Sequence, residues 1–230
     1  MASKLLTEKI AEDIIQLIRN NKMKPGDKLA NEYELAKNLN AGRGSIREAI
    51  KLLVSRNILL VRQGAGTFVS REQGIPIDPL GFTFIDNKIK LASDLLEIRL
   101  ILEPEIAAMA ATYATKTECE NILNQCDIVE KLIEEKQNHD KADADFHKSI
   151  AIASGNLVTA NLIPIIHTSV SINIDLTKNE LTDQTCRYHR IIAESISKGD
   201  VQEARYAMIM HINFNREALA ERYKIDKRKH

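Results

Sequence analysis

The stretch AGRGSIREAIKLLVS, residues 41–55, decides the fold of the first third of this chain. Its apolar residues recur at helical spacing, so one face of a helix can be buried. The other face carries Arg43 and Arg47 one turn apart, with Ser45 between them in sequence. A helix with basic and hydroxyl groups near its N-terminus and an apolar back suits the DNA major groove. This indication is weak alone, and the neighbouring segments strengthen it.

The segments before this helix predict two further helices. Apolar residues at helical period predict one over 5–21, and Lys24-Pro25-Gly26-Asp27 ends it as a turn. Asn31 is the expected N-cap of a short helix over 32–38, because its side chain can accept hydrogen bonds from free amides.

The segment after this helix predicts a β-hairpin. Two short aliphatic strands flank Gln63-Gly64-Ala65-Gly66-Thr67, a turn with two glycines. Glycine permits positive φ and a close approach of the backbone to phosphate. An ordinary structural hairpin stays an alternative for Gly64. Three helices followed by a hairpin are the order of a winged helix-turn-helix domain, which we expect over 1–71.

Charge is unevenly distributed although the formal net charge is zero. Residues 1–71 hold 13 Lys and Arg against 7 Asp and Glu, a net charge of +6, and the rest of the chain has a net charge of −6. Such asymmetry suggests a basic domain for a polyanion joined to a domain that does not bind one.

The three cysteines, Cys119, Cys126 and Cys186, show no metal-finger spacing. The N-terminus is amphipathic and carries acidic residues, unlike a signal peptide, and no apolar run reaches membrane-spanning length. We therefore expect a cytoplasmic protein without a membrane partner.

Residues 88–230 predict an antiparallel all-α helical bundle, joined to the first domain by a linker over 72–87. Pro104 and Pro164 lie inside predicted helices and should kink them. The fold class is mainly α. The expected helices lie near 91–114, 117–137, 140–153, 157–176, 183–198 and 201–223.

Longer motifs resemble a known family. PGDKLANEYELAKNLNAGRGSIREAIKLLVSRNILLVRQGAGTFV (25–69) resembles the GntR family of bacterial transcriptional regulators. The second half resembles the FCD effector domain of the FadR-like branch, through DLLEIRLILEPEIAAMAA (94–111), DADFHKSIAIASGN (143–156), YHRIIAESISKGD (188–200) and ARYAMIMHI (204–212). Together these motifs cover nearly the whole chain.

The resemblance implies double-stranded DNA as the partner, a palindromic operator and a homodimer. Arginines on the 41–55 helix would reach guanine edges or phosphates, and the hairpin would enter the minor groove. For Arg47, a salt bridge within the helix, for example with Glu48, is the alternative. The implied DNA-binding residues are Arg43, Ser45, Arg47, Gly66 and Thr67, with Gln63 a further candidate.

Two positions depart from the family pattern. Ala41-Gly42 stands where a valine and a capping serine are frequent, and Tyr33 stands where an arginine is common. We expect both to affect the operator sequence preferred.

Polar residues on otherwise apolar faces predict a metal site in the second domain. Asp143 and His147 lie four residues apart on one helix, so both side chains can reach one ion. His189 and His211 lie about three turns before and after the Gly199-Asp200 turn, so we expect them at similar height on neighbouring helices. One aspartate and three histidines suit a divalent transition metal: zinc first, then nickel or manganese. Buried histidines satisfied by hydrogen bonds are the alternative.

Other candidates near this site are weaker. His167 is expected in the core or beside the ligands, and Asp145 is expected in solvent. By the resemblance, Arg99 faces the same cavity and pairs with a carboxylate effector, since a guanidinium offers two parallel donors. An ion pair between Arg99 and Glu103 is the alternative.

These observations predict a DNA-binding regulator controlled by a small organic or sugar acid. An effector-independent DNA-binding protein with a structural metal site is the second hypothesis. A metal-dependent enzyme is the third, and it is disfavoured because no HExxH motif or obvious general base is present.

Overall fold

In the computed structural model, residues 2–71, 74, 78–166 and 182–224 are described, and the predicted His167 lies outside them. The chain divides into two units, Met1–Gly81 and Phe82–His230. Each unit has its own hydrophobic core, and we describe each by itself.

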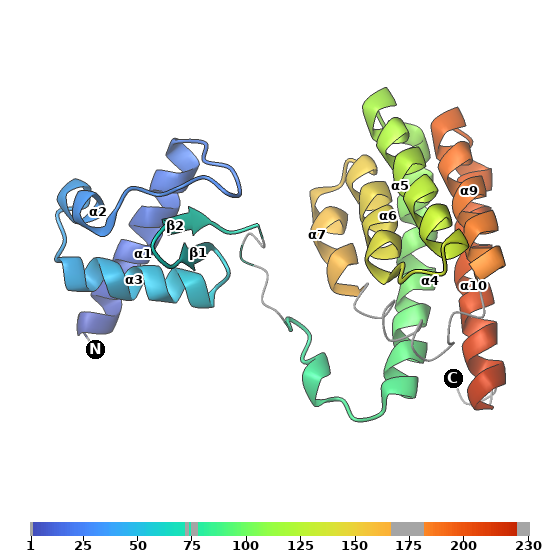
Figure 1. Cartoon of the computed structure of the whole chain (residues 1–230), viewed down its shortest axis with the longest axis horizontal. Helices are drawn as coiled ribbons and strands as arrows, with labels where there is room; N and C mark the ends of the chain where they lie inside the picture. The colour runs from blue at the N-terminus through green and yellow to red at the C-terminus, as the bar shows by residue number, and fades with distance from the viewer. Residues whose placement is uncertain (1, 72–73, 75–77, 167–181, 225–230) are drawn as a thin grey trace. The chain divides into compact units, whose positions relative to one another are not determined.

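The first unit is a winged helix-turn-helix, as the sequence predicts (Figure 1). Its helices pack around a core in which Ile14, Leu35, Ile46 and Leu53 have no exposed surface. The apolar face of the 41–55 stretch forms the centre of that core. The elements are α1 (Ala2–Asn20), α2 (Glu32–Asn38), α3 (Arg43–Ser55), β1 (Leu59–Arg62) and β2 (Gly66–Val69).

The two short helices begin differently. Asn31 caps α2: its side chain accepts from the Glu34 amide at 2.9 Å, while the Glu34 carboxylate accepts from the Asn31 amide at 3.1 Å. This reciprocal pair fixes where α2 starts. The N-cap of α3 is Gly42, which forms no side-chain cap. The missing serine therefore leaves the start of α3 without a hydroxyl acceptor.

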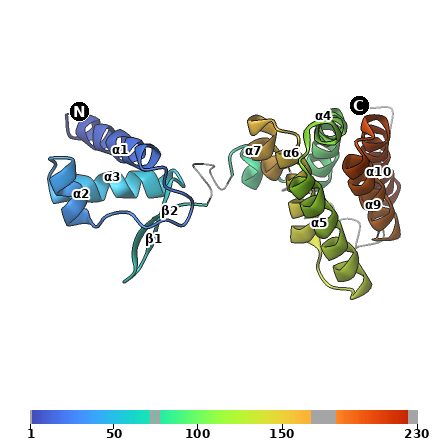
Figure 2. The ribbon, with the colours of Figure 1, turned by 90° about the horizontal axis from the view of Figure 1, so that it is seen from above.

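The hairpin differs from the prediction in one respect. Gly66 opens strand β2 opposite Arg62, so Gln63, Gly64 and Ala65 alone form the tip. Gly66 has φ +120°, which lets the chain enter the strand directly after this short turn. Figure 2 shows the hairpin projecting beyond the three helices.

The second unit is an all-α bundle, also as predicted. A 3-10 turn (Phe82–Phe84) precedes it, and α4 and α10 run side by side along it (Figure 1). Pro104 lies inside α4 without ending it. None of the helices in the described ranges has both the length and the apolar character needed to cross a bilayer. The helices are α4 (Lys88–Tyr113), α5 (Lys116–Glu134), α6 (Asp140–Ala153), α7 (Leu157–Ile166), α9 (Thr182–Lys198) and α10 (Val201–Tyr223).

Candidate DNA-binding surface and metal site

The predicted DNA-binding residues of α3 lie on its outer face. Arg43 and Arg47 are exposed, and Ser45 is half-buried. The partner of Arg47 is Glu32, the first residue of α2, at 2.8 Å. The alternative partner, Glu48, instead pairs with Lys51 at 2.9 Å. The alternative of a salt bridge within α3 therefore does not hold for Arg47, because the first turn of α2 reaches it.

Cations lie beside the two predicted contact residues of the hairpin, one of them Lys28 from the segment before α2. A Cβ on Gly66 would lie 2.8 Å from Cε of Lys28, so this position has no room for a side chain unless Lys28 moves. The amide of Leu29 donates to the carbonyl of Thr67 at 2.8 Å. The Arg62 guanidinium lies 4.8 Å from the centre of the Phe68 ring. Lys28 and Arg62 are exposed, so the hairpin presents positive charge.

Three histidines from three helices meet in the second unit. His147 comes from α6, His189 from α9 and His211 from α10, and one potential ligand atom of each lies within 4.8 Å of the others. All three are buried. The ring centres of His189 and His211 are 4.7 Å apart, which confirms that the Gly199-Asp200 turn brings them to similar height.

Asp143 joins the three histidines as predicted. Its two carboxylate oxygens lie 3.4 Å from Nε2 of His189 and 3.9 Å from Nε2 of His147. Two ligand atoms about 2.1 Å from one ion are roughly 3.0–3.4 Å apart in tetrahedral or octahedral geometry. The spacing to His189 is at the upper end of this range, and the spacing to His147 exceeds it.

Burial shifts the pKa values of two members of this cluster. It lowers the pKa of His189 well below its usual value, and the neighbouring His211 and His147 lower it further. Neither ring nitrogen of His189 has a hydrogen-bond partner in the described part of the chain. Burial also raises the pKa of Asp143, and His147 opposes that rise. A neutral buried imidazole whose nitrogens have no hydrogen-bond partner can donate a lone pair to a metal ion. The residues present therefore fit a metal ion.

Two further residues orient the cluster, and the sequence did not assign them this role. Nδ1 of His147 lies 2.6 Å from the Glu103 carboxylate, which turns Nε2 toward Asp143. A carboxylate behind a ligating histidine is the usual support of such sites. The Phe146 ring stacks on His189 with centres 4.2 Å apart. Glu103 could have been found from its spacing of four residues after Arg99.

Arg99 is at this site, and it also forms the alternative ion pair. Its Nε donates to the Glu103 carboxylate at 2.6 Å, and its Nη2 lies 3.4 Å from Nε2 of His147. Only 1% of the residue is exposed. The guanidinium is therefore held by α4 against the histidine cluster.

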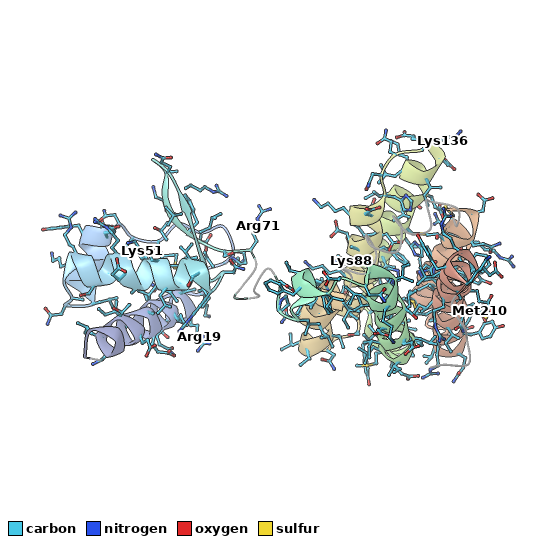
Figure 3. The ribbon with its side chains drawn as sticks, turned by 90° about the horizontal axis from the view of Figure 1, so that it is seen from below. Arg19, Lys51, Arg71, Lys88, Lys136 and Met210 are labelled. Atoms are coloured by element: carbon cyan, nitrogen blue, oxygen red, sulfur yellow. The ribbon has the colours of Figure 1, made fainter. Side chains whose placement is uncertain are left out.

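Other candidates lie outside the cluster. Asp145 is exposed, as predicted. His139, buried one turn before Asp143, borders a cavity of about 640 Å³ that Lys136 also lines. Lys136 is labelled just beyond the end of α5 in Figure 3. Burial raises the pKa of Cys126 to about 12 and that of Cys186 to about 11, so both thiols stay protonated.

Two family profiles match this chain. Residues 6–69 match the bacterial regulatory proteins of the gntR family, and residues 94–214 match the FCD domain. The first contains α3 and the hairpin, and the second contains the histidine cluster.

Individual proteins agree with these profiles. A protein of Escherichia coli (strain K12), provisionally named as a regulatory protein of the L-lactate dehydrogenase operon, is 32% identical over 91% of this chain and 84% of its own. The transcriptional repressor NanR of Enterobacter sp. (strain 638) is 26% identical over 93% and 85%. The solved structure of Streptococcus agalactiae GntR is 37% identical, with a TM-score of 0.81 over 92% of this chain and 99% of that one.

The chain belongs to the GntR family of bacterial transcriptional regulators and carries an FCD domain. It is a DNA-binding regulator with an effector-binding domain, not an enzyme.

The buried ion pair gives a stability prediction. Arg99→Ala would leave the Glu103 carboxylate buried without its guanidinium, which costs roughly 3–5 kcal/mol for such pairs. We expect native-state hydrogen exchange of α4 and α6 peptides, measured with chelator present, to show this loss. Lys90→Ala is the matched control, because it removes an exposed pair with Asp94 on the same helix. Equal protection in the two variants would contradict the prediction.

Proposed function

We propose that a small organic or sugar acid, bound beside a metal ion in the FCD domain, controls the affinity of this regulator for its operator. The observation that carries the proposal is the buried meeting of Asp143, His147, His189 and His211 with Arg99. A cation and a guanidinium at one site suit a carboxylate held at two points. The relative named for an L-lactate dehydrogenase operon supports a small acid as the class of ligand.

We propose that Arg43, Ser45 and Arg47 read DNA in the major groove, while Gly66 and Thr67 of the hairpin approach the minor groove. The exposure of Arg43 and Arg47 on α3, and of the cations Lys28 and Arg62 at the hairpin, supports this. One recognition helix and one wing cover a half-site, so the proposal requires a homodimer on a pseudo-palindromic operator. Ile98 and Ile101, 45% and 67% exposed on α4, are candidate dimer contacts.

Arg47→Ala tests the reading of DNA. In selection from a randomised duplex library, we expect the full-length protein to enrich two inverted half-sites about one helical turn apart. The variant should lose the preference at one base pair in each half-site, worth roughly 1–3 kcal/mol for a bidentate arginine on guanine. If the variant enriches the same sequence as the parent, the assignment of Arg47 is contradicted. If the parent enriches a single half-site, the homodimer is contradicted.

We propose zinc as the ion held by Asp143, His147, His189 and His211, with nickel or manganese as the other candidates. Imidazole nitrogens are borderline ligands and a carboxylate oxygen is a hard one, and these ions accept both. When bound, the ion would act as a Lewis acid toward a carboxylate. Glu103 would hold the His147 ring in place, and Phe146 would hold that of His189.

Elemental analysis tests the metal site. Protein purified without chelator should carry about one transition metal ion per chain, since a buried site of this kind binds tightly. We expect His189→Ala and His211→Ala to lose the metal. His139→Ala should keep it, because this buried histidine is outside the cluster. Unchanged stoichiometry in both cluster variants would remove the assignment.

A thermal-shift screen of small carboxylates and sugar acids, run with and without metal, tests the effector. A true effector should raise the melting temperature only with metal present and should change operator affinity, typically by about 1–3 kcal/mol. Arg99→Lys should weaken the response, because an ammonium lacks the two-pronged geometry. Metal-bound protein that responds to no acid would favour the second hypothesis, a purely structural ion. The second hypothesis is supported by the ion pair between Arg99 and Glu103, because this pair already engages the guanidinium.

A further inference from the structure

Arg47 of α3 and Glu32 of α2 form an ion pair at the protein surface. Nε of Arg47 lies 3.2 and 3.3 Å from the two oxygens of Glu32, and Nη2 lies 2.8 Å from one of them. The carboxylate therefore engages one edge of the guanidinium in two-pronged fashion. This geometry is narrower than a simple charge pair, because it fixes the plane of the guanidinium as well as its position.

The contact leaves the edge of Arg47 that reads DNA available. A guanidinium has five N–H donors, and Glu32 uses one on Nε and one on Nη2. Both donors of Nη1 and the second donor of Nη2 remain, and these form the edge that pairs with O6 and N7 of a guanine. Arg47 can therefore keep Glu32 and read a base at once.

Glu32 is in a position to act as a fixed support. It is the first residue of α2, whose start is set by the reciprocal Asn31 and Glu34 cap. A carboxylate in the first turn is favoured by the helix dipole. The Glu32 side chain is 34% exposed, against 55% for Arg47, so the carboxylate is the less exposed partner of the two.

Stability does not account for this pair. Ion pairs between exposed side chains contribute little to folding, because solvent screens them. A carboxylate near the DNA-facing side of α3 also repels phosphates, which weakens binding to any sequence. Glu32 therefore weakens binding to DNA of any sequence, and at the same place it orients the Arg47 guanidinium. Arg43, whose charge also acts on Glu32, lies on the same face.

We propose that Glu32 is a specificity-determining positioning residue: it holds the Arg47 guanidinium in the orientation that discriminates one base, and it lowers affinity for all other DNA. This inference rests on the proposed reading role of Arg47. It concerns a residue that would act through Arg47 rather than by touching a base.

Glu32→Gln in the full-length protein tests the proposal, with Glu48→Gln as the matched control. Both changes remove one negative charge from the same surface. Glu48 faces Lys51 instead of Arg47, and Lys51 is labelled on α3 in Figure 3. The probes are the duplex that the parent enriches from a randomised library, the same duplex altered at the base pair lost in Arg47→Ala, and an unrelated duplex.

We expect both glutamine variants to bind the unrelated duplex several-fold more tightly. Only Glu32→Gln should lose discrimination at the altered base pair, by about tenfold out of the roughly 10–100-fold that a bidentate arginine provides. Glu32→Asp, which keeps the charge but shortens the reach, should lie between Glu32→Gln and the parent. A circular dichroism melt checks that α2 and the fold are retained.

The outcomes separate this inference from the function it rests on. If Glu32→Gln keeps the discrimination of the parent, or behaves as Glu48→Gln does, the positioning role is overturned while Arg47 remains the reader. If Arg47→Ala itself keeps full discrimination, the reading role of Arg47 is what fails. A loss of discrimination confined to Glu32→Gln and Arg47→Ala supports the proposal.

Discussion

The second unit depends on burying ionisable groups together. Arg99 and Glu103 from α4, Asp143 and His147 from α6, and one histidine each from α9 and α10 lie in one interior region. Removing such groups from water is expensive, and the expense is offset only if partners meet in good geometry. The four helices are therefore constrained to one register by their polar groups, in addition to their apolar packing.

The same constraint explains why this region suits a ligand. His189 is buried with ring nitrogens that find no hydrogen-bond partner in the described ranges, and burial keeps it neutral. The Glu103 carboxylate lies 2.6 Å from Nδ1 of His147, while Nε2 of the same ring faces Asp143. A structure that already gathers three buried imidazoles and a carboxyl group needs little reorganisation to bind a cation.

The first unit follows the opposite rule. Its described buried residues are apolar except for Ser70, and its charged groups lie outside the core. The Arg47 and Glu32 pair is exposed, so it is worth little to folding and is free to serve recognition. Rigid helices with defined starts hold such groups more precisely than loops do, and the capped start of α2 is an example.

The sequence by itself determined the two-domain organisation, the element order and the buried faces, because helical period and turn residues are local signals. It also indicated which residues gather in the buried histidine cluster, since His189 and His211 are symmetric about one short turn and Asp143 and His147 are one helical turn apart. Only the tertiary structure decided which side chains contact one another. The salt bridge from α2 to Arg47, the Glu103 carboxylate behind His147 and the Phe146 ring on His189 depend on side-chain directions. Such contacts between side chains cannot be derived from spacing along one helix, because they depend on how separate helices are rotated against each other.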